Sequence, residues 1–146
     1  MEKKIKNVFV DGPITPEKIA SSIAHHQVKT NIGAHDIFLG QVRADIINDQ
    51  TVKAIEYSTY DEMANSIFHE IRESAFEKYN LTCMHIYHSR GIVKAGEICL
   101  FVFTSSIHRP DAMDACRYLV EEIKEKAPIF GKEIFEDDSF VWKENK

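Results

Sequence analysis

The hydrophobic positions of this 146-residue chain recur with two different periods, which predict helices and strands in mixed order. A spacing of three and four residues predicts an amphipathic helix over residues 60–79, with an apolar stripe made of Tyr60, Met63, Ala64, Ile67, Phe68, Ile71, Ala75 and Phe76. A second helix has a stripe made of Ala112, Ala115, Cys116, Leu119, Val120 and Ile123. Pro128 ends it, because proline disrupts a helix interior. Thr15 and Pro16 predict the N-cap and first residue of a shorter helix.

Runs of alternating or continuous apolar residues predict strands between these helices. We expect strands at residues 5–10, 34–43, 52–58, 81–88, 97–106, 133–136 and 140–143. The run at residues 98–103 is apolar throughout, which predicts a central strand that is buried on both faces. The polar residues 44–51 predict a mobile loop. Neighbouring strands follow one another directly, so the pattern favours an α+β fold with a largely antiparallel sheet and packed helices.

Length and composition bound the class of protein. A chain of 146 residues fits one domain over residues 1–146, and 44% hydrophobic with 28% charged residues is ordinary for a soluble globular protein. The net charge of -5 argues against binding nucleic acid, which calls for a basic face. Neither a membrane span nor an N-terminal signal peptide is present in the sequence, which predicts the cytoplasm. Three widely spaced cysteines indicate buried apolar side chains in a reducing compartment.

Known metal and nucleotide motifs are absent, so we expect neither a metal nor a cofactor. The odd separation of His85 and His88 places them on opposite faces of a strand. Positively charged side chains remain as the candidate chemistry, because arginine clamps phosphate and crowded lysine loses its proton more easily. The candidates are Arg43, His108, Arg109, Lys124 and Lys132.

The length of the second long helix decides whether Arg109 and Lys124 can belong to one site of the same chain. Arg109 and Lys124 are fifteen positions apart. At about 1.5 Å per residue they lie roughly 22 Å apart, too far for one small ligand to touch both. If both serve one site, a two-fold homodimer must bring opposite ends of two helices together. The simpler alternative is that Lys124 and Lys126 only complement the helix dipole.

The order of several short motifs resembles that in the large, catalytic subunit of molybdopterin synthase over residues 33–142. The motifs are Gly40-Gln41-Val42-Arg43, Glu56-Tyr57-Ser58-Thr59-Tyr60 with Met63-Ala64, His88 with Gly91, Gly96-Glu97, Ser105-Ser106-Ile107-His108-Arg109, and Lys124-Glu125-Lys126-Ala127-Pro128-Ile129-Phe130. The resemblance implies an α/β-hammerhead fold and a homodimer with one ubiquitin-like small subunit at each end. It also implies sulfur transfer from the thiocarboxylated Gly-Gly terminus of that subunit to cyclic pyranopterin monophosphate, which forms molybdopterin.

The resemblance also implies roles for individual residues. Lys124 falls on the family's catalytic lysine. The implied substrate-binding residues are Gln41, Val42, Arg43, His108, Arg109, Lys124, Gly131, Lys132 and Glu133. One departure concerns a second lysine that the family places in the site, because Gly131 occupies that position here. Lys132 is the candidate to replace it, helped by the backbone freedom of the glycine before it, and the alternative is that Lys132 points to solvent on a strand beside Glu133.

Two other functions are compatible with the same residues. The chain could be a non-catalytic scaffold that binds a ubiquitin-like tail, as the missing lysine suggests, or a small anion-binding module unrelated to sulfur. Conversion of the cyclic pterin in the presence of a thiocarboxylated partner distinguishes the enzyme from both. Lys124 could act as a general acid and base or as a nucleophile on the acyl carbon of the partner, and the sequence does not separate these roles.

Overall fold

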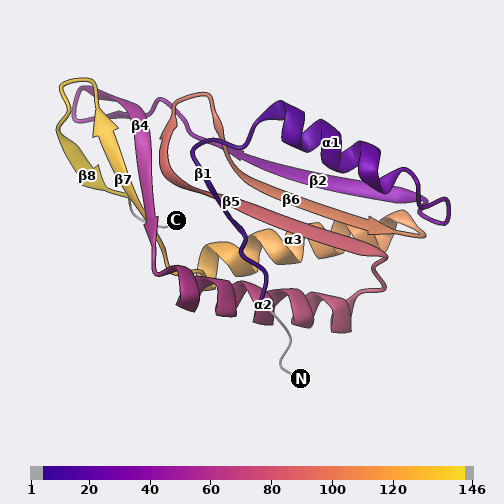
Figure 1. Cartoon of the computed structure of the whole chain (residues 1–146). Coiled ribbons are helices and arrows are strands. Elements are labelled where there is room, and N and C mark those ends of the chain that lie inside the picture. Colours follow the sequence, from indigo (N-terminus) through magenta and orange to yellow (C-terminus); the bar gives the residue numbers. More distant parts are fainter. Residues whose placement is uncertain (1–4, 144–146) are drawn as a thin grey trace.

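A computed structural model describes residues 5–143 of the chain. Within this range three helices pack on an eight-stranded sheet (Figure 1). The helices are α1 (Pro16–His26), α2 (Asp61–Lys78) and α3 (Arg109–Lys126). The strands are β1 (Phe9–Asp11), β2 (Ala34–Gln41), β3 (Ile46–Ile47), β4 (Gln50–Thr59), β5 (Cys83–Lys94), β6 (Ile98–Ser106), β7 (Ile129–Phe135) and β8 (Phe140–Trp142).

The sheet is almost entirely antiparallel. Its main order is β2-β6-β5-β4-β7-β8, with β3 paired to β4, and β1 is the one strand of the described range that pairs in parallel, with β5. Strand β5 changes partner along its length. Residues Cys83 to His88 pair with β6, whereas Gly91 to Lys94 pair with β4, and Gly91 has a φ of 89°. The left-handed region is open to glycine at little cost, so Gly91 lets one strand join the two parts of the sheet.

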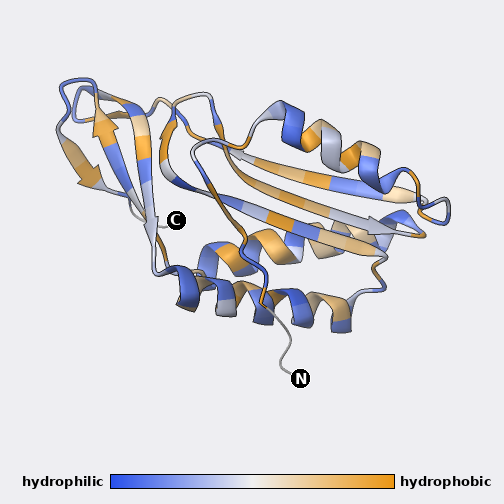
Figure 2. Ribbon diagram, in the orientation of Figure 1, coloured by the Kyte–Doolittle hydropathy of each residue, from blue (hydrophilic) through white to orange (hydrophobic). Residues whose placement is uncertain are grey.

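The helices cover both faces of the long strands β2, β6 and β5 (Figure 1). Helices α2 and α3 lie on one face and α1 on the other. Phe68 of α2 and Leu119 of α3 are fully buried against the sheet, while Phe101 and Phe103 of β6 belong to a separate core under α1. The bands of apolar residues along these elements are visible in Figure 2. Because β6 is covered on both faces, its alternating side chains enter two different cores.

The α+β class, the antiparallel sheet and the packed helices are confirmed. Thr15 caps α1 by accepting a hydrogen bond from the Lys18 amide, and Pro16 is its first residue. Strand β6 is buried along almost its whole length, as its continuous apolar run predicts. The predicted stripe of α3 is buried except for Val120, which is partly buried. The buried stripe of α2 is narrower than the sequence predicts, since Tyr60 and Met63 are 66% and 57% exposed.

The segment predicted to be a mobile loop, residues 44–51, is instead a tight β-hairpin. Ile46 and Ile47 of β3 pair with the start of β4. Asn48 and Asp49 form the turn with φ values of 51° and 64°. Asn and Asp tolerate this left-handed conformation better than other side chains, and two such residues match a two-residue hairpin turn. The polar residues of this segment therefore indicate a tight turn and not a mobile loop.

The boundaries of three other strands also differ from the prediction. Strand β2 ends at Gln41, so Val42 and Arg43 follow it. Strand β5 continues to Lys94, whereas the predicted strand ended at residue 88. Strand β7 begins at Ile129, directly after Pro128, rather than at residue 133. Because of this last difference, Gly131, Lys132 and Glu133 all lie within β7, where successive side chains point to opposite faces.

Candidate functional site

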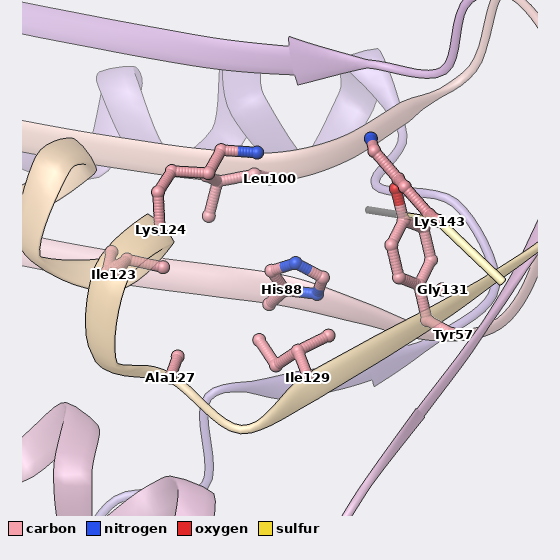
Figure 3. Close-up of a pocket in the computed structure, with 9 residues that line it drawn as sticks. All are labelled: Tyr57, His88, Leu100, Ile123, Lys124, Ala127, Ile129, Gly131 and Lys143. Carbon is pink, nitrogen blue, oxygen red and sulfur yellow. The ribbon is translucent and has the colours of Figure 1, made fainter. Parts of the chain in front are cut away.

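The C-terminal end of α3 borders a small cavity where the two parts of the sheet meet (Figure 3). Its volume is about 70 Å³. Four side chains with polar groups line it, namely Tyr57, His88, Lys124 and Lys143. The remaining lining residues are Leu100, Ile123, Ala127, Ile129 and Gly131. Lys124 is placed here because the apolar stripe of α3 buries the adjacent Ile123 against the sheet, and Pro128 ends the helix immediately afterwards.

Lys124 has a lowered pKa in this position. Part of the residue is exposed to solvent, yet the surrounding atoms desolvate its ammonium, and this burial is the largest cause of the lowered pKa. The positive charges of Lys143 and Arg43 lower the pKa further, whereas Cys99 opposes them. The sequence predicts crowding by Arg43, Arg109 and Lys132. Within one chain the structure brings Arg43 near Lys124, and Lys143 takes the place expected of Lys132.

His88 lies on the floor of the cavity and is almost fully buried. Its Nδ1 donates a hydrogen bond to the backbone carbonyl of Ser89 at 2.7 Å, which leaves Nε2 as an acceptor. Burial lowers the pKa of His88 to about 4, with smaller contributions from the charges of Lys124 and Lys143. His88 is therefore a neutral imidazole at pH 7. Its position on the face opposite to His85 confirms the prediction from their spacing, since His85 contacts His26 of α1 at 2.7 Å.

Tyr57 completes the wall of the cavity from β4. Its ring packs edge-on against the His88 ring at 5.1 Å between centroids. Burial, followed by the neighbouring Cys99 thiol and the Glu133 carboxylate, raises the pKa of Tyr57. The phenol consequently keeps its proton across the physiological range and can act as a hydrogen-bond donor, with Cys99 as one neighbour. Tyr57 and His88 together make the cavity polar without adding charge to it.

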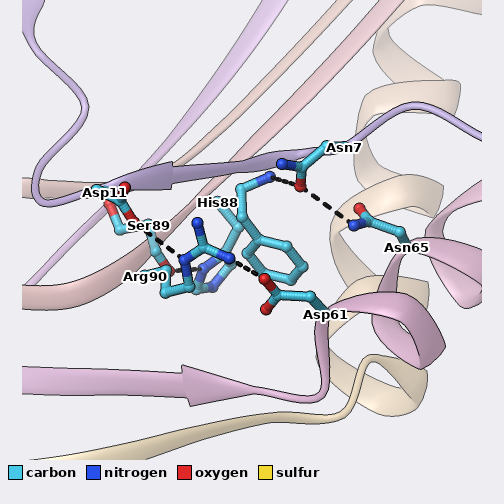
Figure 4. Close-up of polar contacts among 8 residues, drawn as sticks. Asn7, Asp11, Asp61, Asn65, His88, Ser89 and Arg90 are labelled. Carbon is cyan, nitrogen blue, oxygen red and sulfur yellow. Dashed lines mark hydrogen bonds and ion pairs between the residues drawn. The ribbon is translucent and has the colours of Figure 1, made fainter.

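His88 is held in place by the strand that turns at Gly91 and by a polar network beside it (Figure 4). Arg90 donates to Asp11 of β1 at 3.0 Å and pairs with Asp61 at the start of α2. Asn65 of α2 also accepts a hydrogen bond from the Val8 amide at 2.9 Å. These contacts fasten β1 and α2 to β5. Arg90 is therefore engaged in a structural network and is not among the residues that line the cavity.

A wider groove of about 800 Å³ adjoins the cavity and shares Lys124 and Lys143 with it. Gln41 and Arg43 line this groove, as does Glu133. The Arg43 side chain is 76% exposed and its Nε lies 3.1 Å from Asp45 Oδ1. Val42 is buried, and its backbone bonds to Gly96 and Glu97 rather than facing the groove. Of the predicted binding residues on this motif, two line the groove and Val42 supports them from below.

Residues Gly131, Lys132 and Glu133 alternate across β7. Gly131 lines the cavity and Glu133 lines the groove, while Lys132 lies on the other face of the strand. The Lys132 ammonium is 4.3 Å from the centre of the Phe140 ring and 3.8 Å from Glu56 Oε1. The hypothesis that this ammonium reaches the pocket of Lys124 is wrong for this structure. Side chains alternate between the two faces of a strand, so Lys132 points away from the face of its neighbours Gly131 and Glu133. Gly131 is an ordinary strand residue, since its φ is not positive.

His108 and Arg109 lie at the opposite end of α3 from Lys124. His108 is the N-cap residue and Arg109 is the first residue of the helix, and both are exposed. Neither lines the cavity or the groove. One chain therefore places these candidates far from Lys124, as the length of the helix predicts.

Three polar residues of the cavity were not among the binding residues predicted from the sequence, namely Tyr57, His88 and Lys143. The alternation of strand residues 52–58 and the odd spacing of His85 and His88 gave a partial signal for the first two. Nothing in the sequence singled out Lys143, because its place depends on how β8 folds back on β7. All three cysteines are buried and free, as predicted.

Two general findings hold for residues 5–143. No group of three or more His, Cys, Asp or Glu side chains in this range is arranged to hold a metal ion. No helix in the same range has the length and apolar character needed to cross a membrane.

The fold agrees with comparisons to known proteins. The model of a family described as MoaE protein matches residues 10–126, which is most of the chain. The chain belongs to the MoaE family. The molybdopterin synthase catalytic subunit of Oryza sativa subsp. indica is 40% identical over 114 residues, which cover 78% of this chain and 58% of that protein. The corresponding subunit of Pyrococcus abyssi is 33% identical over 76% of this chain and 74% of that protein.

A solved structure supports the same family membership. The X-ray structure of molybdopterin synthase from Staphylococcus aureus matches this chain with a TM-score of 0.82 and 31% identity, covering 97% of this chain and 99% of that one. The MoaE chain described here spans less than two thirds of the length of the rice protein. The match in fold confirms the predicted class, and residues 10–126 include Lys124 and every element from α1 to α3.

The buried His88 predicts a specific dependence of stability on pH. In the unfolded chain this imidazole titrates at its ordinary value of 6.5, and in the folded protein at about 4. Between these values the unfolded state binds more protons, so the free energy of unfolding falls as the pH falls from 6.5 to 4. The full shift corresponds to about 3 kcal/mol. Replacing His88 with Gln should remove this part of the loss.

Urea unfolding of the parent and the His88→Gln variant at several pH values between 4 and 7 measures this effect. His85 titrates in the same window because its pKa is also lowered to about 4, so the informative quantity is the difference between the two proteins. The variant should be the less stable protein at pH 7, through lost packing, and the gap should narrow towards pH 4. Curves that stay parallel over this range would contradict a buried neutral His88.

Proposed function

We propose that this chain is the catalytic subunit of a molybdopterin synthase, and hence a sulfurtransferase. It transfers sulfur from the thiocarboxylated Gly-Gly C-terminus of a ubiquitin-like small subunit to cyclic pyranopterin monophosphate. The observation that carries the proposal is the position of Lys124 in a partly buried cationic pocket, in a chain of the MoaE family. Relatives in that family are called molybdopterin synthase catalytic subunits, a name that implies a second subunit.

The charges of the site suit these substrates. The thiocarboxylate and the pterin phosphate are both anions, and the cavity and groove carry Lys124, Lys143 and Arg43. Arg43 is exposed at the groove, where its Nε and Nη2 face Asp45, and the other N–H groups of its guanidinium can donate to a phosphate. The lowered pKa of Lys124 makes its neutral amine more available for proton transfer or for attack on an acyl carbon. Tyr57 and His88 add a donor and an acceptor without charge.

The assembly follows from the length of α3. His108 and Arg109 do not reach the site of their own chain, so we propose a two-fold homodimer in which they complete the site of the partner. Each end of this dimer would then bind one small subunit, with the tail of that subunit entering beside Lys124. Three buried thiols without a disulfide fit a reducing compartment, and we place the enzyme in the cytoplasm.

A reconstituted assay tests the function. The purified chain is mixed with a thiocarboxylated small subunit and cyclic pyranopterin monophosphate, and molybdopterin formation is followed together with binding of the small subunit. The enzyme should form product and lose this activity in the Lys124→Ala variant. A protein that binds the small subunit and forms no product would be the scaffold that the missing lysine at Gly131 suggested, and the proposal would fail.

A further inference from the structure

Lys143, directly after β8, lies at the site, whereas Lys132 of β7 does not. Lys143 follows Trp142 directly, and its amide donates a hydrogen bond to the Gly131 carbonyl at 2.8 Å. The pairing of Trp142 with Lys132 sets the register of the two strands. Lys143 is therefore anchored beside Gly131 by the backbone, and its side chain extends towards the cavity that contains Lys124 (Figure 3).

Two residues line both the small cavity and the wider groove, and both are lysines. These are Lys124 from α3 and Lys143. They lie at the boundary between the two, so a ligand in the groove that places a group in the cavity would pass between them. The cavity of about 70 Å³ is far below the roughly 300–1,000 Å³ of a typical small-molecule pocket, so it admits a compact head group only.

Glycine at position 131 leaves room for this arrangement. A Cβ atom on Gly131 would lie 3.5 Å from the Cβ of Lys143 and 3.6 Å from Cε1 of Tyr57, so the position faces the wall of the cavity. It would also lie 3.2 Å from Cγ2 of Ile55, which is tighter than usual contact. A long side chain at position 131 would thus compete with Lys143 for the same space.

We infer that Lys143 is the second ammonium group of the site and that Lys124 and Lys143 together hold a compact anionic group of the ligand. The inference rests on the proposed function for the identity of that ligand. Two nearby ammonium groups repel each other, and an anion between them relieves the repulsion. Lys132, the other lysine of the β7–β8 hairpin, contacts Phe140 and Glu56 on the opposite face and does not share this site.

Turnover in the reconstituted assay tests the inference with three matched variants. Lys143→Met removes the charge while keeping an unbranched side chain, and it should slow sulfur transfer at least tenfold. Lys126→Met is the control, because Lys126 pairs with Glu122 in the last turn of α3 and lines neither the cavity nor the groove. It should remain within twofold of the parent. Turnover of Lys143→Met within twofold of the parent, or a greater loss in Lys132→Met than in Lys143→Met, would overturn the inference.

A second measurement does not depend on sulfur transfer. Lysines are labelled by reductive ¹³C-methylation, and the NMR signal of Lys124, assigned with Lys124→Arg, is followed during separate titrations with inorganic phosphate and with thioacetate. In the parent at least one of the two probes should shift this signal, and Lys143→Met should weaken that binding at least fivefold. The pKa of Lys124 should rise in the same variant, because a neighbouring positive charge is removed. Unchanged binding and an unchanged Lys124 pKa would overturn the inference.

The two measurements separate the inference from the proposed function. Tighter binding of thioacetate identifies the tail of the small subunit as the source of the anion, and tighter binding of phosphate identifies the pterin. A parent protein that forms no molybdopterin yet binds either anion in a Lys143-dependent manner would refute the sulfur-transfer function and support the paired lysines.

Discussion

Substitution of Lys124 with alanine is expected to abolish sulfur transfer, with a loss of at least about a hundredfold, the lower range of general acid–base catalysis. The reason is that the pKa of the Lys124 amine is lowered by burial and by Lys143, so its neutral form is more available for proton transfer or attack. Single-turnover formation of molybdopterin measures the loss. Binding of the small subunit, measured by calorimetry, should remain largely intact because the substitution removes one side chain at the edge of the cavity.

The Lys124→Arg variant separates chemistry from charge. Arginine keeps the positive charge but does not deprotonate at accessible pH, so it should also be inactive if the amine takes part in the reaction. In the parent, the rate should rise with pH as the neutral amine forms, and this rise should begin below the ordinary lysine range because the pKa is lowered. Turnover close to the parent in the arginine variant would show that Lys124 contributes charge alone.

Mixing two inactive variants is expected to restore activity. One variant carries His108→Ala and Arg109→Ala, and the other carries Lys124→Ala. In a heterodimer of the two, one shared site has all its residues and the other lacks both sets, so about half of the parental turnover per dimer should return. The physical basis is that one α3 helix holds these groups at its two ends and neither His108 nor Arg109 lines the cavity of its own chain.

The experiment requires a verified heterodimer. Two different affinity tags, purified in sequence after co-expression, isolate the mixed species from both homodimers. Each homodimer serves as its own control and should stay inactive. A heterodimer that is pure, folded and still inactive would show that His108 and Arg109 act within one chain or not at all, and the shared site would have to be abandoned.

The periodicity of the sequence was sufficient to predict the helices and the central strand. The apolar stripe of α3 identified its buried face, and Pro128 identified its end, so the position of Lys124 beside the core followed from local pattern. The continuous apolar run of β6 likewise predicted a strand covered on both faces. These features were predictable because each depends on residues close together in the sequence and on the burial of apolar surface.

The second cation of the site was decided by the tertiary structure. Whether Lys132 or Gly131 faces the cavity depends on the register of β7 against β4, which pairs Gly131 with Tyr57 and Lys132 with Glu56 and turns Lys132 outward. The place of Lys143 depends on its backbone bond to Gly131 across the hairpin. Both contacts depend on the pairing register of neighbouring strands, and a shift of that register by one residue moves every side chain of a strand to its other face. The sequence alone therefore determined which element carries Lys124, and the packing of β7 and β8 determined which lysine joins it.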